Sequence, residues 1–336
     1  MADRARTRDP QGSRPSRRSG GLVMHWRAKG VVQKVLGHAP GGVHAHYLLQ
    51  RRFGGLRNLG DEFEAKLGDW RLMVSHLRDA GRSIVDARLL EIGSGWYPAF
   101  PFACFLGGAR NVITVDCRRR LKAELARDCA IELSRFTSFI ADACGVLERD
   151  VRERQRQLER RLAECFDLHA ATDGVVTYDA PVDATNTRFG PQQLDCVFSN
   201  CVLEHVRPDA IDGIFREALR ILSPGGLMFH SINCGDHYAS IDRGITRLNY
   251  LKYSDTQWRR WNNPFLYQNR LRAFEFTERA QSAGFQILMS TENPPASQLR
   301  ELAGLRVHPQ FAHIPPERLC VTSVDFVARK PDAVAP

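Results

Sequence analysis

A turn of small residues and an acid one strand later are the parts of this sequence best suited to chemistry. The run LLEIGSGWYPAFP, which begins at Leu89, carries Gly93, Ser94 and Gly95. Glycine tolerates unusual backbone dihedral angles and leaves room for a ligand against the main chain. Asp116 directly follows the next apolar run, NVITV. A carboxylate at that place can accept hydrogen bonds from both hydroxyls of a ribose.

Alternating strand and helix patterns over residues 88–233 predict the frame that positions these groups. The fold class is α/β, a doubly wound and mostly parallel Rossmann-like sheet of seven strands, in which ligands bind at the carboxyl ends of the strands. The strands are predicted at RLLEIG, NVITVD, GVVTYDAPVDA, LDCVFSN, LMFHSIN, QILMSTE and LCVTSVDFVARK, and the last of these is expected to pair in antiparallel fashion.

A dinucleotide site would need the fuller pattern GxGxxG, which aims a helix N-terminus at a pyrophosphate. Here the third glycine is replaced by Pro98, and aromatic residues occupy the turn. The sequence therefore disfavours a diphosphate ligand.

Five stretches in this order resemble the class I S-adenosylmethionine-dependent methyltransferases, and the resemblance covers residues 89–231. They are LLEIGSG, the acid at Asp116, APVDA, DCVFSNCVLEHV and LRILSPGGLMFHS. The resemblance implies S-adenosylmethionine as the cofactor. It places Glu91 and the backbone of Gly93, Ser94 and Gly95 around the methionine part, Asp116 on the ribose, Asp183 and Ala184 at adenine, and Asn200 beneath the sulfonium.

Polar residues near the ends of later strands are the candidates for catalysis. Tyr178 ends the third predicted strand, where its ring could face a cation. Asp236 and His237 follow the fifth strand and are the acid-base candidates. His205 is interpreted as a hydrogen-bonded structural residue. No metal site is expected, because the nine cysteines form no CxxC pair and the histidine spacing fits no ligand set.

The chain divides into three predicted parts. Residues 1–30 are expected to be a disordered basic tail, because Arg, Pro, Ser and Gly dominate its first twenty residues. Residues 31–84 are predicted to form a helical N-terminal extension. Residues 85–336 form the cofactor-binding domain, with an aromatic-rich insertion at about 235–275 that is expected to act as a lid, although its aromatic residues could equally pack a small core of their own.

These observations predict methyl transfer to a small molecule, with the acceptor unidentified. One alternative is the reaction of azetidine-2-carboxylate synthases, which cyclise S-adenosylmethionine and release methylthioadenosine. The other alternative is a non-catalytic protein that binds S-adenosylmethionine. The basic tail invites a nucleic-acid partner, but no binding fingerprint follows it. A cytoplasmic protein without a membrane partner is expected, because no apolar run is long enough to span a bilayer. A nucleic-acid partner is not expected either. The sequence does not predict an oligomeric state.

Overall fold

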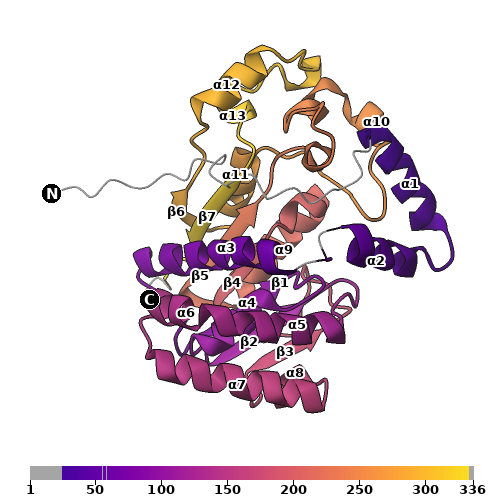
Figure 1. Ribbon diagram of the computed structural model, residues 1–336. Helices are drawn as coiled ribbons and strands as arrows, with labels where there is room; N and C mark the ends of the chain where they lie inside the picture. Colours follow the sequence, from indigo (N-terminus) through magenta and orange to yellow (C-terminus); the bar gives the residue numbers. More distant parts are fainter. Residues whose placement is uncertain (1–24, 55, 58, 333–336) are drawn as a thin grey trace. The chain divides into compact units, whose positions relative to one another are not determined.

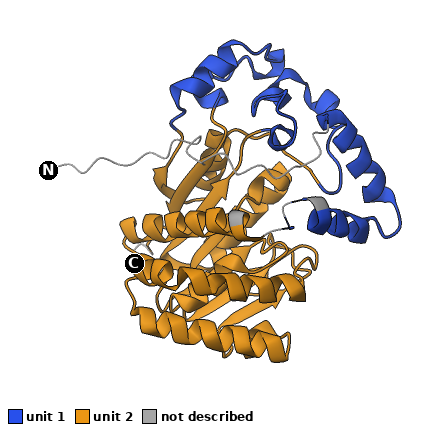
Figure 2. Ribbon diagram, in the orientation of Figure 1, with its two compact units in different colours: residues 1–57, 236–265, 293–320 blue, residues 58–235, 266–292, 321–336 orange. Residues whose placement is uncertain are grey.

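The computed structural model describes residues 25–332 except 55 and 58 (Figure 1). These residues form two compact units (Figure 2). Unit 1 contains the described part of 1–57 together with 236–265 and 293–320, and unit 2 contains the described parts of 58–235, 266–292 and 321–336. Of the predicted basic tail, residues 1–24 lie outside the described residues, while residues 26–30 begin a helix.

Unit 2 is built on a seven-stranded sheet of order β3-β2-β1-β4-β5-β7-β6. Neighbouring strands are parallel from β3 to β5, and β7 runs antiparallel to both β5 and β6. The predicted doubly wound, mostly parallel sheet is therefore confirmed, including its antiparallel strand. The strands are β1 (Arg88–Ile92), β2 (Asn111–Val115), β3 (Val176–Asp179), β4 (Leu194–Asn200), β5 (Leu222–Ile232), β6 (Gln286–Ser290) and β7 (Val324–Arg329).

The helices of unit 2 follow the apolar patterns of their sequences. Helix α4 (Ala99–Leu106) is AFPFACFL, apolar on every side, and all its residues are buried because α3, α7 and β2 pack around it. Helix α9 (Pro208–Ile221) instead buries one stripe, which packs with α11 on the sheet. The others are α3 (Leu59–Asp79), α5 (Ala123–Leu133), η1 (Ser134–Phe136), α6 (Thr137–Cys144), α7 (Glu148–Glu164), α8 (Leu168–Ala171), η2 (Leu203–His205) and α11 (Ala273–Ser282).

Helix α5 begins at Ala123, seven residues after Asp116. Hydrogen bonds outside a helix occupy the intervening backbone, because Arg120 N–H donates to the Tyr178 hydroxyl and Lys122 N–H donates to the Trp96 carbonyl. These two bonds tie the chain after β2 to the ends of β3 and β1.

Unit 1 packs helices from three distant segments around a cluster of aromatic rings. Trp26 lies at the centre, with ring centroids 4.7 Å from Trp261 and 5.4 Å from Tyr238, and it also contacts Tyr253 and Trp258. The aromatic residues of the predicted insertion thus form a core within unit 1. The helices are α1 (Trp26–His38), α2 (Gly42–Phe53), η3 (His237–Ser240), η4 (Asn249–Lys252), α10 (Asp255–Trp258), α12 (Ala296–Ala303), η5 (Pro309–Phe311) and α13 (Pro316–Leu319).

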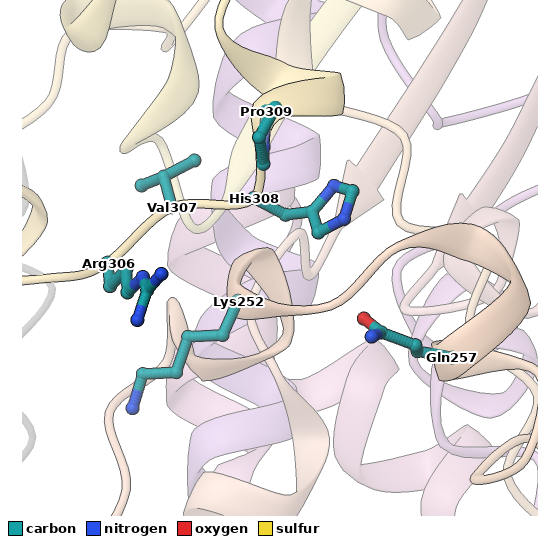
Figure 3. A pocket seen from close by; sticks show the side chains of 6 residues that line it. All are labelled: Lys252, Gln257, Arg306, Val307, His308 and Pro309. Atoms are coloured by element: carbon teal, nitrogen blue, oxygen red, sulfur yellow. The ribbon is translucent and has the colours of Figure 1, made fainter.

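Unit 1 also holds a pocket of about 340 Å³ (Figure 3). Its lining residues are Lys252, Gln257, Arg306, Val307, His308 and Pro309. Across the described residues, no helix combines the length and the apolar character needed to cross a membrane.

Candidate functional site

The glycine turn leaves the carboxyl end of β1 and has two glycines with positive φ, +87° at Gly93 and +71° at Gly95. A Cβ on Gly93 would lie 2.6 Å from a methyl group of Val202, so close packing requires glycine there. A Cβ on Gly95 would meet no atom within 4 Å. The second glycine therefore borders open space, as a turn that admits a ligand would.

Glu91 lies beneath this turn and is almost fully buried. The Thr114 hydroxyl donates to its carboxylate over 2.5 Å, and the Ser94 hydroxyl is hydrogen-bonded to the same threonine oxygen. Burial raises the pKa of Glu91 to about 7, although the Thr114 hydrogen bond and the charge of Lys66 oppose that shift. The carboxyl group is thus fixed between β1 and β2.

Asp116 lies one residue past β2, and the Gly95 backbone of the glycine turn is close enough to lower the pKa of its carboxyl. Its own backbone bonds to Asp179 and Val182 fix its position. Burial raises the pKa of Asp116 to about 6, against the opposing charge of Arg120. The structure therefore brings together the two features that the sequence singled out first.

Tyr178 is the penultimate residue of β3 and supports Asp116. Its hydroxyl accepts a hydrogen bond from the Arg120 N–H over 3.0 Å and donates to the Asp116 carboxylate over 3.3 Å. The guanidinium of Arg119 lies over the ring, 5.6 Å from its centroid. The Arg119 guanidinium therefore contacts the Tyr178 ring, and the Tyr178 hydroxyl positions Asp116.

The predicted adenine and sulfonium residues lie at the ends of β3 and β4. Asp183 is exposed, and two hydrogen bonds from Thr185, over 2.9 and 2.7 Å, hold the pKa of its carboxyl below the usual value. Ala184 packs against the main core. Asn200 is the last residue of β4 and lies partly exposed in register with Ser231 of β5.

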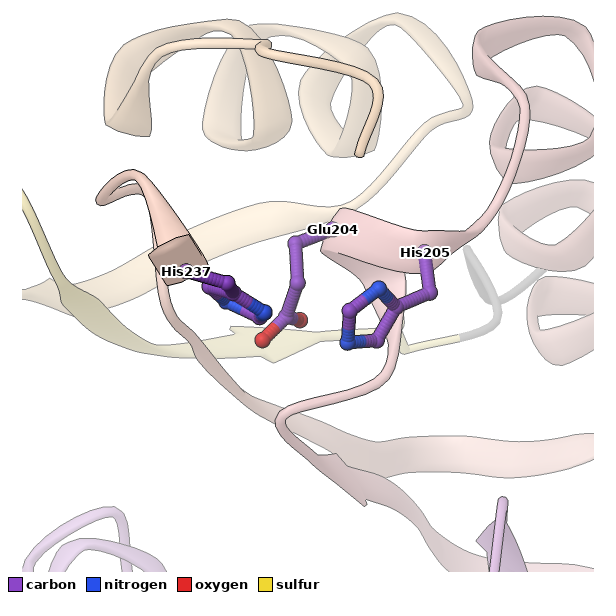
Figure 4. A group of neighbouring side chains, drawn as sticks. All are labelled: Glu204, His205 and His237. Carbon is purple, nitrogen blue, oxygen red and sulfur yellow. The ribbon is translucent and has the colours of Figure 1, made fainter. Parts of the chain in front are cut away.

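The helix η2 follows β4 and carries Glu204 and His205 (Figure 4). Asn269 fastens it from a distant segment: its backbone N–H donates to the Glu204 carbonyl over 3.0 Å, and its side chain donates to the carbonyls of Leu203 and Val206 over 2.7 and 2.8 Å. Glu204 is buried, which raises the pKa of its carboxyl to about 8. The helix is therefore held rigidly at the carboxyl end of β4.

His205 has an exposed side chain whose protonation pattern is set by one contact. Its Nδ1 lies 2.6 Å from the backbone oxygen of Tyr267. A carbonyl only accepts hydrogen bonds, so Nδ1 carries the proton and Nε2 of the neutral ring can accept one. Desolvation lowers the pKa of His205, and the charge of Arg120, which also acts on Asp116, contributes in the same direction.

Asp236 and His237 belong to unit 1. Asp236 is buried and is the N-cap residue of η3; its carboxylate accepts hydrogen bonds from the Tyr238 N–H over 2.9 Å and from the Asn249 side chain over 2.8 Å. His237 is the first residue of η3. Asp236 therefore holds the short helix on which His237 lies.

The turn and its acid could be predicted from the sequence, but the residues that hold η2 in place could not. Tyr267 lies 62 residues from His205 in the chain, and Asn269 lies further still. No local pattern signals such contacts, because they depend on how the segment after unit 1 returns to the sheet.

Comparison with known proteins identifies the class. Residues 145–230, from just before α7 into β5, match a family model described as a methyltransferase domain. The match covers about a quarter of the chain; with the sheet described above it indicates a class I S-adenosylmethionine-dependent methyltransferase, and the predicted cofactor is confirmed. The matched segment does not include the glycine turn. No curated protein matches the chain.

Solved structures resemble the chain only distantly. One is an S-adenosylmethionine-dependent methyltransferase from Mesorhizobium loti, at 14% identity over 76% of this chain and 96% of that one, with a TM-score of 0.41. Another is the YcgJ protein from Bacillus subtilis, at 14% identity over 79% and 99%, with a TM-score of 0.40. A third is the [4+2]-cyclase SpnF, at 19% identity over 78% and 82%, with a TM-score of 0.40.

Proposed function

We propose that this methyltransferase acts on a small molecule and holds S-adenosylmethionine at the carboxyl ends of β1, β2 and β4. The observation that carries the proposal is the position of Asp116 beside the Gly95 backbone, which brings a carboxyl group with a pKa of about 6 to an open glycine turn. Bound S-adenosylmethionine supplies an electrophilic methyl group on a sulfonium.

Each residue around this point has a role that its surroundings favour. Asp116 accepts hydrogen bonds from the ribose hydroxyls, and Tyr178 positions it. Glu91 and the backbone of the turn at residues 93–95 bind the methionine part. At the adjacent strand ends, Asp183 and Ala184 border the adenine, and Asn200 lies beneath the sulfonium.

A proton acceptor is needed only if the methyl acceptor carries a proton that must leave. We propose His205 for this role in unit 2, because its Nε2 is unprotonated while the ring is neutral. Nε2 of His205 would take up the proton that the acceptor loses as it is methylated. In unit 1, His237 keeps its proposed acid-base role, and Asp236 acts by positioning η3.

The charge distribution supports a small acceptor over a polynucleotide. Residues 1–54 contain 11 of the 47 Lys and Arg and 2 of the 38 Asp and Glu, so residues 55–336 contain 36 of each. A surface that tracks a phosphate backbone needs a local excess of cations. The part of the chain that forms the cofactor site has no such excess in its composition.

The test is to incubate the purified protein with S-adenosylmethionine alone and then with candidate acceptors, following the products by mass. S-adenosylhomocysteine that appears only with an acceptor supports methyl transfer. Methylthioadenosine with a four-membered amino acid, formed without any acceptor, would show cyclisation instead. Tight binding with no product across a broad acceptor panel would favour a binding protein.

A further inference from the structure

We propose that the pocket of unit 1 binds the carboxylate or phosphate group of a small anion, independently of the cofactor site. Two cations line it, Lys252 and Arg306, on the left of the view in Figure 3. Within the described residues, neither side chain forms an ion pair or a hydrogen bond. Two uncompensated cations beside one hollow attract a negative group.

His308 adds a hydrogen-bond donor whose direction is fixed. Its backbone N–H donates to the Leu251 carbonyl over 2.8 Å, which ties this wall of the pocket to η4. Its Nδ1 accepts a hydrogen bond from the Gln310 N–H over 3.2 Å. The neutral ring therefore carries its proton on Nε2, which can donate to a ligand.

Gln257 adds a further donor by the same reasoning. Its side-chain oxygen accepts a hydrogen bond from the Ser254 N–H over 2.8 Å in the capping box of α10. This contact orients the amide, so its NH₂ group is the part that can serve a ligand. The Gln257 side chain and the His308 ring lie on the right of the view in Figure 3.

The nearest acid along the chain is engaged elsewhere. Asp255 accepts a hydrogen bond from the side chain of Gln310 over 3.1 Å, and its backbone N–H donates to the same amide over 2.9 Å. The polar side chains that line the pocket are therefore cations or hydrogen-bond donors, while Val307 and Pro309 supply the apolar lining. A volume of about 340 Å³ suits a small organic anion.

The experiment is calorimetric titration of the full chain at low ionic strength with inorganic phosphate, and separately with succinate. Either anion is expected to bind, and the preferred one identifies the source of the negative group. Lys252→Ala and Arg306→Ala should each weaken binding about threefold to fivefold, as expected for exposed charge pairs. Arg306→Lys should retain most of the affinity.

The matched control is Arg259→Ala, which removes an exposed cation of the same unit that is not part of the pocket lining. It should leave anion binding unchanged, and all variants should keep the melting temperature and cofactor affinity of the native protein. The proposal is overturned if neither anion binds at about 10 mM, or if Arg259→Ala weakens binding as much as the pocket variants do. Because cofactor affinity is measured separately, failure here leaves the proposed function untouched.

Discussion

At the scale of single residues, the proposed cofactor site depends on two carboxyl groups whose ionisation is tuned by burial. Glu91 and Asp116 end adjacent strands and have pKa values raised to about 7 and about 6. Both therefore titrate close to the conditions in which the protein would work, so their protonation becomes a measurable property of cofactor binding.

Asp116 gives the first prediction. The carboxylate is charged above about pH 6 and neutral below it, so affinity for S-adenosylhomocysteine should fall as the pH drops through that value. Asp116→Asn should weaken binding by about 1–3 kcal/mol at pH 7.5, the usual cost of losing a charged hydrogen bond, and should remove the part of the pH dependence that is centred near pH 6. Calorimetry between pH 5 and 8 measures both. A steep pH dependence that persists in the variant would point to another group.

The two glycines of the turn give a matched pair. Alanine at either position places a side chain at positive φ, which costs about 1–2 kcal/mol. Gly93→Ala also meets Val202 and should lose about 1–3 kcal/mol more of unfolding free energy. Gly95→Ala should stay better folded and lose cofactor affinity instead. Urea unfolding and calorimetry separate the two effects, and equal stability of the variants would contradict the packing described at Gly93.

At the scale of elements, η2 contains a buried acid and is held by hydrogen bonds from a residue outside the helix. Its bonds to Asn269 hold the helix, while Glu204 keeps a proton inside it. The two features predict different experiments, because one concerns pH and the other concerns local order.

The pKa of Glu204 in the folded state is raised from 4.5 to about 8, so the folded protein binds an extra proton between these values. Its stabilising contribution is complete below pH 4.5 and is lost as the pH rises through about 8. Glu204→Gln should therefore flatten the decline of unfolding free energy between pH 5 and 8.5. The exposed Glu164→Gln is the control and should follow the native curve. Identical curves for Glu204→Gln and the native protein would refute the buried, protonated state.

Asn269→Ala removes the two side-chain hydrogen bonds to Leu203 and Val206. It should cost about 1–3 kcal/mol, because two part-buried carbonyls each lose a hydrogen bond, and should speed hydrogen exchange within residues 203–206. Asn269→Asp, which restores the shape but removes the donor, should not rescue protection. Unchanged exchange in both variants would show that other contacts hold η2.

At the scale of the whole molecule, the sequence predicted what is local and missed what is distant. The strands, the glycine turn and Asp116 could be predicted from the sequence, because each depends on residues that are neighbours in the chain. Unit 1 was not readable, because it joins Trp26 to residues more than two hundred positions away, and no periodicity records such a contact. The start of α5 at Ala123 depends on a similarly distant contact, since the Tyr178 hydroxyl accepts a hydrogen bond from the preceding backbone.

Deletion of residues 1–24 tests the predicted tail in the context of the whole chain. Every residue proposed to hold the cofactor lies in unit 2, so the truncated protein should bind S-adenosylhomocysteine within about twofold of the native affinity, even though six arginines are removed. Calorimetry at two salt concentrations is the measurement. A large loss that shrinks as the salt concentration rises would mean that the charges of the arginines contribute to the site.

The position of β7 between β5 and β6 has a consequence for synthesis on the ribosome. β6 is translated before its sheet neighbour β7, so β6 cannot join the sheet until residues 324–329 have left the exit tunnel. Until then β5 has an unpaired edge and β6 has no partner in this order, a state in which nascent chains aggregate or recruit chaperones. Ribosome-stalled chains that stop before residue 324 should therefore be cleaved by protease readily, and chains long enough to expose β7 should resist.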